Sequence, residues 1–240
     1  MNEQILERMN QLRLHGMHKM YNTMLETRQH QNLTAEVLLS TLLQSEWEER
    51  YNKRLSRLLK NARFRYQASL DEINFPEGRN LDKNTFLQLA DCGFIDRKEN
   101  LLITGSTGVG KSHIASALGH QACAMGYHVA YFNTQKLFAR LKISRADGSH
   151  NKEIVRIEKA DLLILDDFGL VPLDGAKRIE LLEIIEDRHG RKSTIICSQL
   201  PVRQWYEIID DSTIADAILD RIIHSAHRFE LKGESLRKKI

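Results

Sequence analysis

Proline and cysteine are scarce in this chain of 240 residues, which has three of each. Residues 1–70 contain no proline and a single glycine, Gly16, so few residues there would interrupt a helix. The cysteines, Cys92, Cys123 and Cys197, lie too far apart for a Cys-x-x-Cys motif, which excludes a metal or redox site built on that motif. We expect all three to be buried, reduced thiols.

Long hydrophobic runs are also missing. No apolar stretch approaches the roughly 20 residues of a membrane-spanning helix, and the start Met1–Gln4 lacks the cationic and apolar regions of a signal peptide. We therefore expect no membrane association and a cytoplasmic location. The net charge of +3 is only mildly basic, so charge alone does not indicate a nucleic-acid partner.

One motif carries specific chemistry. The segment Gly105-Ser106-Thr107-Gly108-Val109-Gly110-Lys111-Ser112 matches the phosphate-binding pattern G-x-x-x-x-G-K-[ST]. The apolar run Leu101–Thr104 precedes it and a helically spaced segment follows, which is the strand–loop–helix context that the motif requires. Backbone N–H groups of such a loop surround phosphates, Lys111 would contact the β- and γ-phosphates, and the Ser112 hydroxyl would ligate Mg²⁺. The loop predicts binding of ATP with Mg²⁺.

A second motif completes this chemistry. The apolar run Leu162–Leu165 ends in two acids, Asp166 and Asp167, about fifty residues after the loop. Asp166 is placed to hold Mg²⁺ through its water shell, and Asp167 to orient or deprotonate the attacking water. Together the two motifs predict ATP hydrolysis. Asp167 is one methylene shorter than a glutamate, which is compatible with slow turnover.

Four short apolar runs predict buried strands at 101–104, 129–132, 162–165 and 194–197. Helical segments separate them, which predicts an α/β fold with a parallel sheet covered on both faces. Residues 1–70 read as an all-α N-terminal domain with a break near Gln29–Thr34, where Thr34 could cap a new helix. The ATPase domain would then occupy 71–240, after a linker around Pro76.

Three further polar residues could belong to the ATPase site. Ser198 ends the fourth strand, beside Gln199, and is either an ordinary strand-end residue or a sensor of the γ-phosphate. Arg221 and Arg237 are either surface residues or the cation that neutralises the departing phosphate. Composition and spacing do not decide which arginine does so.

Basic residues gather in two stretches. The first has no acid between its members, which are Arg50, Lys53, Arg54, Arg57, Lys60, Arg63 and Arg65. The second lies between the second and third strands and includes Lys136, Arg140, Lys142 and Arg145, followed by Lys152, Arg156 and Lys159 on another helix. Each stretch could be a solvated helix face, although the one-signed first run favours an anionic partner. Neither interleaves aromatic residues, so contact with a duplex backbone fits better than single-strand stacking.

These motifs, in this order, carry a resemblance. Besides the loop, they are Asp166-Asp167-Phe168-Gly169, Ser198-Gln199-Leu200-Pro201 with Trp205, Asp220-Arg221-Ile222 and Leu231-Lys232-Gly233-Glu234-Ser235-Leu236-Arg237. The chain resembles the IstB-like ATPases, helper proteins encoded beside insertion-sequence transposases and relatives of the DnaC helicase loaders in the AAA+ superfamily. The resemblance covers about residues 70–240. It extends to the N-terminal region through Leu12-Arg13-Leu14-His15-Gly16-Met17 and Leu43-Gln44-Ser45-Glu46-Trp47-Glu48-Glu49-Arg50.

The resemblance implies an AAA+ core with a truncated lid, and an ATPase that forms homo-oligomers on duplex DNA and recruits its transposase. By position, Ser198 would be the first sensor, Arg221 the arginine finger donated to a neighbouring subunit, and Arg237 the second sensor acting in cis. The expected DNA contacts are Arg50, Lys53, Arg54, Arg57, Lys136, Arg140, Lys142 and Arg145.

Two other functions remain open at this point. A DnaC-like helicase loader would share the ATPase core, although the N-terminal motifs favour the transposition helper. A small-molecule phosphotransferase is a third class, but the chain lacks an obvious arginine-rich lid and acceptor site.

Overall fold

The computed structural model describes residues 2–29 and 33–236. Contacts between residues divide the chain into two compact units, Met1–Arg57 and Leu58–Ile240, called here the N-terminal unit and the C-terminal unit. The domain division expected from the sequence, 1–70 and 71–240, stays a prediction. None of the helices in the described part of the chain is long and apolar enough to cross a membrane.

The N-terminal unit is entirely helical. It comprises α1 (Asn2–Gln11), α2 (His15–Glu26) and most of α3 (Ala35–Ala62). Met9, Tyr21 and Leu42 form its small apolar core. The Thr34 hydroxyl accepts a hydrogen bond from the Val37 N–H at 3.4 Å, so Thr34 caps α3 as expected. Part of the expected break, residues 30–32, lies outside the described residues.

Two N-terminal motifs of the resemblance meet at Gly16. The Glu46 carboxylate Oε2 accepts hydrogen bonds from the N–H groups of Gly16, at 2.7 Å, and Met17, at 3.2 Å, in the first turn of α2. The Ser45 hydroxyl donates to the Gly16 carbonyl at 3.0 Å. A Cβ atom on Gly16 would lie 2.3 Å from the Ser45 carbonyl oxygen, so only glycine allows α2 and α3 to approach this closely.

The C-terminal unit is an α/β domain built on a parallel sheet. Its five strands run in the order β2-β3-β4-β1-β5. The strands are β1 (Asn100–Gly105), β2 (Val129–Asn133), β3 (Leu162–Phe168), β4 (Ser193–Ser198) and β5 (Ala226–Leu231). The four expected strands are confirmed. β5, at the sheet edge, has an alternating pattern and was not predicted.

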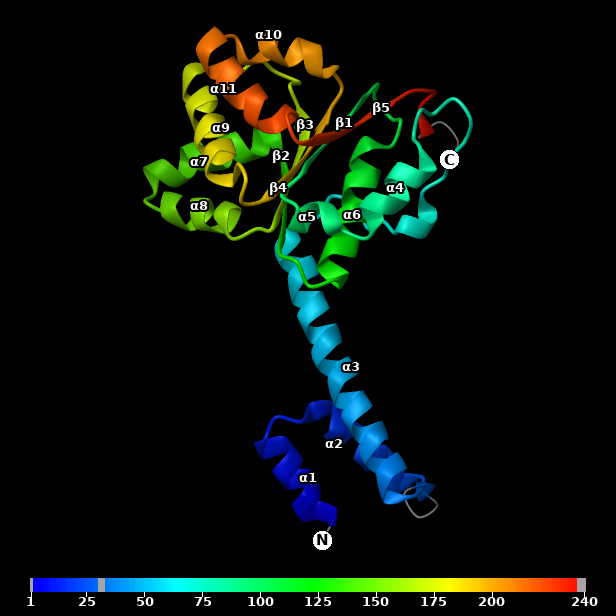
Figure 1. The fold of residues 1–240 in the computed structure, drawn as a ribbon. Helices are drawn as coiled ribbons and strands as arrows, with labels where there is room; N and C mark the ends of the chain where they lie inside the picture. The colour runs from blue at the N-terminus through cyan, green and yellow to red at the C-terminus, as the bar shows by residue number, and fades with distance from the viewer. Residues whose placement is uncertain (1, 30–32, 237–240) are drawn as a thin grey trace. The chain divides into compact units, whose positions relative to one another are not determined.

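Helices cover both faces of the sheet (Figure 1). The α-helices are α4 (Lys83–Ala90), α5 (Gly93–Asp96), α6 (Lys111–Ala124), α7 (Thr134–Ala146), α8 (His150–Glu158), α9 (Gly175–Arg188), α10 (Trp205–Ile209) and α11 (Ser212–Ile223). Two short 3-10 helices, η2 (Leu70–Glu72) and η3 (Val202–Gln204), complete the unit. One apolar cluster joins the sheet to α7, α9 and α11.

Polar residues fix where several of these helices start. The side chains of Asp82, Asn133, Asp174 and Asp211 each accept a hydrogen bond from a backbone N–H in the first turn of α4, α7, α9 and α11. All three cysteines are buried and unpaired, as expected. The resulting sheet places the carboxyl ends of β1, β3 and β4 next to one another, and the candidate site lies there.

Candidate nucleotide site

The phosphate loop joins the end of β1 to the start of α6. Gly108 and Gly110 have φ angles of 88° and 97°, which other residues rarely adopt. A Cβ atom on Gly108 would also lie 2.1 Å from the Ser235 hydroxyl oxygen. The loop therefore needs glycine at these positions. The N-terminal end of α6, which attracts anions, borders the cavity in front of the loop.

Lys111, the first residue of α6, is buried in the loop. Its ammonium Nζ donates to the carbonyl oxygens of Gly105 and Ser106, both at 2.8 Å. These carbonyls belong to the loop itself, so the lysine is already held at the place where phosphates would bind. Phosphate oxygens would compete with the two carbonyls for its protons.

Asp166 is a fully buried carboxylate at the end of β3. Its Oδ1 accepts from the Ser112 hydroxyl at 2.8 Å, and its Oδ2 accepts from the Tyr131 hydroxyl. Burial, and then the Asp166 charge, raise the pKa of Tyr131, so its hydroxyl stays protonated and remains a donor. The two residues that the sequence assigned to Mg²⁺, Ser112 and Asp166, are thus in direct contact.

Asp167 follows with a φ angle of 57°, an uncommon value for a residue with a side chain. Its Oδ2 accepts from the Asn133 amide at 2.8 Å and from the Arg65 guanidinium at 3.1 Å. Arg65 Nη1 also lies 3.8 Å from Oδ2 of Asp166. A cation from outside the sheet therefore offsets part of the negative charge of the two acids.

Phe64 fixes the position of Arg65. Its ring lies 4.3 Å from the His120 ring and 6.1 Å from the Tyr131 ring, centroid to centroid. A Cβ atom on Gly119 would lie 2.4 Å from the Phe64 ring, so α6 accommodates this ring only because residue 119 is glycine. The end of α3 is thereby anchored beside the two acids.

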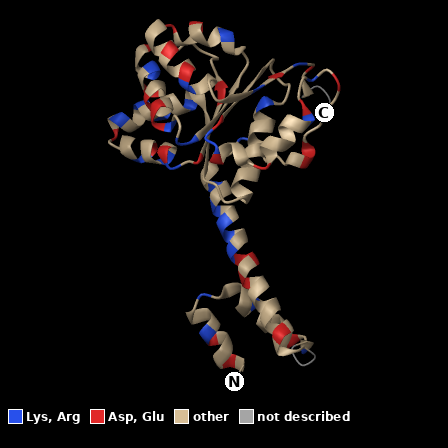
Figure 2. Ribbon diagram, in the orientation of Figure 1, with Lys and Arg blue, Asp and Glu red and all other residues tan. Residues whose placement is uncertain are grey.

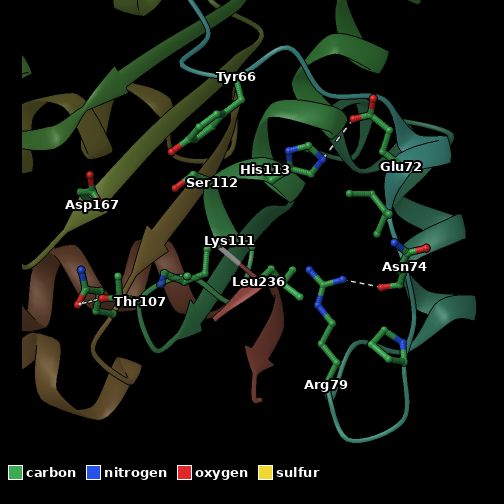
Figure 3. A pocket seen from close by; sticks show the side chains of 15 residues that line it. Tyr66, Glu72, Asn74, Arg79, Thr107, Lys111, Ser112, His113, Asp167 and Leu236 are labelled. Atoms are coloured by element: carbon green, nitrogen blue, oxygen red, sulfur yellow. Dashed lines mark hydrogen bonds and ion pairs between the residues drawn. The ribbon is translucent and has the colours of Figure 1, made fainter. Parts of the chain in front are cut away.

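A cavity of about 390 Å³ lies in front of the loop (Figure 3). Its walls come from the loop, the start of α6, Asp167 and the segment between α3 and α4, which contributes Tyr66, Ile73 and Pro76. Arg79 joins that segment to the loop, since its guanidinium donates to the Asn74 carbonyl at 2.5 Å and the Val109 carbonyl at 3.1 Å. The cavity combines an apolar side with a phosphate-binding side, as a nucleotide requires.

Ser198, the expected sensor, and its neighbour Gln199 make different contacts at the end of β4. The Ser198 hydroxyl is buried, donates to the Phe168 carbonyl at 2.8 Å and accepts from the Leu200 N–H at 3.1 Å. Gln199 lines the cavity instead, and its Oε1 accepts from the Thr107 hydroxyl of the loop at 2.8 Å. Of the two residues, Gln199 is therefore the one that borders the cavity, while a sensor role for Ser198 stays a prediction.

Arg221 lies on α11 and does not line the cavity of its own chain, so far as the described residues define it. Its guanidinium donates to the Ala217 carbonyl at 2.9 Å and to the Glu186 carboxylate at 3.0 Å. A role in this site would require a second copy of the chain. Arg237 lies outside the described residues, and its expected sensor role stays a prediction.

The residues present fit a magnesium ion. Mg²⁺ prefers oxygen ligands and keeps several waters, so a hydroxyl, a carboxylate and phosphate oxygens suffice. Ser112 and Asp166 supply the first two, 2.8 Å apart. Within residues 2–29 and 33–236, no cluster of three or more His, Cys, Asp or Glu side chains could hold a metal by itself. A metal here would therefore depend on the nucleotide.

Comparison with known proteins agrees with this geometry. The family model described as "IstB-like ATP binding protein" matches residues 7–240. The chain belongs to this family. An insertion sequence ATP-binding protein of Sinorhizobium fredii is 44% identical over 233 residues, covering 97% of this chain and 95% of the relative. The ATP-binding protein of insertion sequence IS21 from Pseudomonas aeruginosa is 30% identical, covering 90% and 82%.

Solved structures share the fold of the IstB-like chain. The DnaC helicase loader is 25% identical with a TM-score of 0.56, covering 69% of this chain and 97% of that one. The structure named DnaI has a TM-score of 0.60 at 22% identity, covering 72% and 93%. The expected family, the AAA+ α/β fold and the enzyme class, an ATPase, are confirmed. The roles of single residues stay predictions.

The basic residues of the IstB-like chain differ in their partners. Figure 2 shows Lys and Arg gathered along part of α3. On that helix Arg50 pairs with Glu46 at 2.7 Å and Lys53 with Glu49 at 2.9 Å, so acids just upstream neutralise part of the one-signed run. On α7, Arg140 pairs with Glu153, and Arg145 with Glu180 at 3.2 Å. Lys136 and Lys142 on α7 are exposed.

Sequence reasoning missed several residues of this IstB-like site. Asn133 ends β2 in register with Asp166, and a polar residue at a strand end next to two acids is a signal that could have found it. Arg65 gave no comparable signal, because it lies 102 residues before Asp167 in a run of other cations. Tyr131 sits within an apolar strand, where an aromatic residue is ordinary.

Proposed function

We propose that this protein is a Mg²⁺-dependent ATPase that assembles on duplex DNA and recruits and stimulates a transposase. The observation that carries the proposal is the contact between the phosphate loop and the two acids. The Ser112 hydroxyl and the Asp166 carboxylate are 2.8 Å apart, and Asp167 borders the cavity. Relatives named as insertion sequence ATP-binding proteins, similar over nearly the whole chain, support the transposition role.

In the proposed reaction the loop N–H groups and Lys111 hold the β- and γ-phosphates of ATP. Asp167 accepts a proton from the attacking water, whose oxygen forms a bond to the γ-phosphorus as the bond to the β–γ bridging oxygen breaks. Gln199 and Thr107 would contact the γ-phosphate from the β4 side. Burial of the site strengthens each of these contacts.

Ser112 and Asp166 would hold Mg²⁺ bound with the nucleotide. The ion would supply charge neutralisation for the phosphates. The hydroxyl and the buried carboxylate already face one another, which limits the rearrangement needed.

Arg221 would serve the site of a neighbouring copy. The leaving phosphate carries extra negative charge, and within its own chain Arg221 is held by Glu186, away from the cavity. An arginine supplied from another subunit is worth roughly 10³–10⁵ in turnover in comparable ATPases and GTPases. ATP would thus stabilise the interface between two copies of the chain.

Duplex DNA would be held mainly by phosphate contacts from basic helices. Among the expected contacts, Lys136 and Lys142 are exposed, whereas Arg50, Lys53, Arg140 and Arg145 already have acidic partners. Such partners weaken but do not abolish attraction for a polyanion. Binding should therefore be strongly salt-dependent and tolerant of DNA sequence.

Binding of a labelled duplex with ATP, with ADP and without nucleotide tests this function, in the absence of any helicase or transposase. We expect binding that needs ATP, and that is lost when Lys111→Ala protein is used. Addition of the cognate transposase should then retain it on the same duplex. Duplex binding that ignores nucleotide would contradict the proposal.

A helicase loader is the second candidate, because the DnaC helicase loader is similar over 97% of its length. Capture of a replicative helicase by this protein without DNA, together with no affinity for duplex, would favour that function.

A further inference from the structure

A second cavity, of about 390 Å³, opens on the C-terminal unit away from the nucleotide site. It lies between the end of α3, the start of β2 and the end of α8. Its titratable lining residues all carry a basic side chain, and they are Lys60, Arg63, His128, Arg156 and Lys159. Four permanent or nearly permanent cations thus face one hollow that has no acid in its lining.

The arginine in this cavity lacks part of its hydrogen bonding. Arg156 donates through Nη2 to the Asn61 carbonyl at 2.9 Å, and its guanidinium carbon lies 4.9 Å from the centre of the Phe132 ring. Its Nη1 is buried, yet no hydrogen-bond partner for it is found in the described part of the chain. A buried cationic donor without an acceptor is costly, and a ligand oxygen would remove that cost.

The cations around Arg156 also favour an anionic ligand at this position. Burial, and then the charges of Arg63 and Arg140, lower the pKa of Arg156. The charge of Glu153 acts the other way and raises the pKa of Arg156. Its Oε1 pairs with Arg140, whereas its Oε2 is buried with no hydrogen-bond partner found in the described part of the chain. Asp161 pairs with His128 and Lys192. Among the described residues, no ion pair involves Lys60, Arg63 or Lys159.

The backbone turn at the end of α3 places one of these cations, Arg63, in the cavity. α3 ends at Ala62, and Arg63 then adopts a φ angle of 61°, in the left-handed region where glycine is usual. This turn allows Phe64 to enter the core beside α6 while Arg63 lines the cavity. The cavity is therefore built by the same anchor that brings Arg65 to the acids.

The lining favours a nucleic-acid phosphate over an acidic protein. Protein interfaces need exposed apolar or aromatic side chains at their centre. Here the apolar lining residues, Leu58, Val129, Ala130 and Ala160, are all buried. The lining side chains that reach solvent are basic, apart from the neutral amide of Asn61, and the guanidinium fork matches phosphate oxygens. The volume is many times the roughly 30 Å³ of one water molecule, enough for a phosphodiester group.

We propose that this cavity binds a backbone phosphate of the duplex, with Arg156 at its floor and Lys60, Arg63 and Lys159 around it. The inference rests on the proposed function, because it assigns a contact for the DNA that the protein would hold. It adds a site built from the end of α3 and the end of α8 to the exposed lysines of α7.

Salt-dependent binding of a labelled duplex tests the site. The main variant combines Lys60→Gln with Lys159→Gln, since both side chains are exposed and neither should be needed for folding. The matched control combines Lys83→Gln with Arg203→Gln, which removes the same charge at exposed positions outside the cavity. Arg156→Gln is the third variant, and its duplex binding is interpreted only if its melting temperature matches that of the wild type.

We expect the cavity variant to bind the duplex about three- to tenfold more weakly than the control, with a salt slope smaller by about 0.9, one phosphate contact. Equal affinities and slopes for the cavity variant and control, with the wild type binding normally, would overturn the inference and leave the proposed function standing. If the wild type itself fails to bind duplex, both the inference and the proposed function are wrong.

A second experiment distinguishes a DNA phosphate from other anionic ligands of this cavity. Inorganic phosphate is titrated against the melting temperatures of wild type and cavity variant, which share an unchanged phosphate loop. If the variant loses stabilisation by phosphate but keeps control-like DNA binding, the cavity takes free anions and the DNA assignment is wrong. Loss of transposase binding with unchanged DNA binding would overturn it equally, in favour of an acidic protein.

Discussion

The guanidinium Nη1 of Arg65 lies 3.1 Å from the Asp167 carboxylate, although the two residues are 102 positions apart. Asn133 donates to the same carboxylate oxygen. Both donors occupy the Oδ2 oxygen of Asp167, so that oxygen is not open to an attacking water. Arg65 also lies 3.8 Å from Asp166, so its charge opposes a metal ion at the same acids.

Arg65→Ala is therefore expected to raise ATP turnover in the absence of DNA by about threefold, or roughly 0.65 kcal/mol. The Mg²⁺ concentration for half-maximal nucleotide binding should fall in the same variant. Steady-state hydrolysis and a Mg²⁺ titration of a fluorescent nucleotide measure the two effects. Arg65→Lys should lie between, and Arg203→Ala should match the wild type. A loss of turnover with an unchanged Mg²⁺ requirement would mean that Arg65 instead orients Asp167 for catalysis.

Lys111→Ala should weaken ATP binding by at least about tenfold, or 1.4 kcal/mol, because the ammonium is the main mobile cation of the loop. In the wild type the ammonium group donates hydrogen bonds to two loop carbonyls, each 2.8 Å away, and it would exchange them for phosphate oxygens. Calorimetric titration with ATP measures the change. Lys83→Ala, an exposed lysine on α4, is the control. Unaltered affinity in the Lys111 variant would remove the loop from the nucleotide site.

Mixing two inactive proteins tests whether sites are shared. Arg221→Ala should bind ATP normally and lose roughly 10³-fold or more in turnover. Asp167→Ala should lose turnover through its own site. In mixed assemblies, some joints combine an intact Asp167 with an intact Arg221, so hydrolysis should reappear. A mixture as inactive as either protein alone would contradict a finger supplied in trans.

The Glu46 contact predicts a pH-dependent N-terminal unit. Burial acts to raise the pKa of Glu46, but the hydrogen bonds from Arg50, Met17 and Gly16 outweigh it and lower the pKa below its ordinary value of 4.5. A lowered folded-state pKa gives stability that is complete at neutral pH and is lost as the pH falls through the folded value. Glu46→Gln resembles the protonated form, so it should destabilise the unit by about 1–3 kcal/mol at pH 7.

Hydrogen exchange of peptides from residues 2–29 in the full chain measures this effect. The variant should exchange faster than the wild type at about pH 7, and the difference should shrink below about pH 4.5. Glu48→Gln, at an exposed position on α3, controls for removal of the same charge from that helix. Equal protection at neutral pH would show that the Glu46 contact does not stabilise the unit.

The sequence predicted the parts of this site that are local in the chain. The loop and the pair Asp166-Asp167 are read directly, because each needs fixed residue types within a few positions. The four predicted strands, β1 to β4, are likewise short apolar runs that can be recognised locally. β5 was missed because Ala226–Leu231 mixes polar with apolar residues instead of forming an apolar run, and its pairing with β1 depends on tertiary contacts.

Contacts between distant segments could not be predicted in this way. Nothing near Arg65 distinguishes it from the six other cations of its run, and only the packing of Phe64 against Gly119 brings it to the acids. The same holds for Glu46, whose acceptor role depends on Gly16 thirty residues earlier. The choice between Ser198 and Gln199 required side-chain directions at the end of β4.

The most direct test of the central claim is the mass of the protein in solution with a duplex, measured without nucleotide, with ADP and with ATP. ATP should produce a discrete assembly on the duplex, while Lys111→Ala protein stays small. Arg221→Ala protein should assemble less completely, because its joint lacks the cation from the neighbouring copy. A protein that remains monomeric with ATP and duplex, yet hydrolyses ATP at its full rate, would contradict a site completed between subunits.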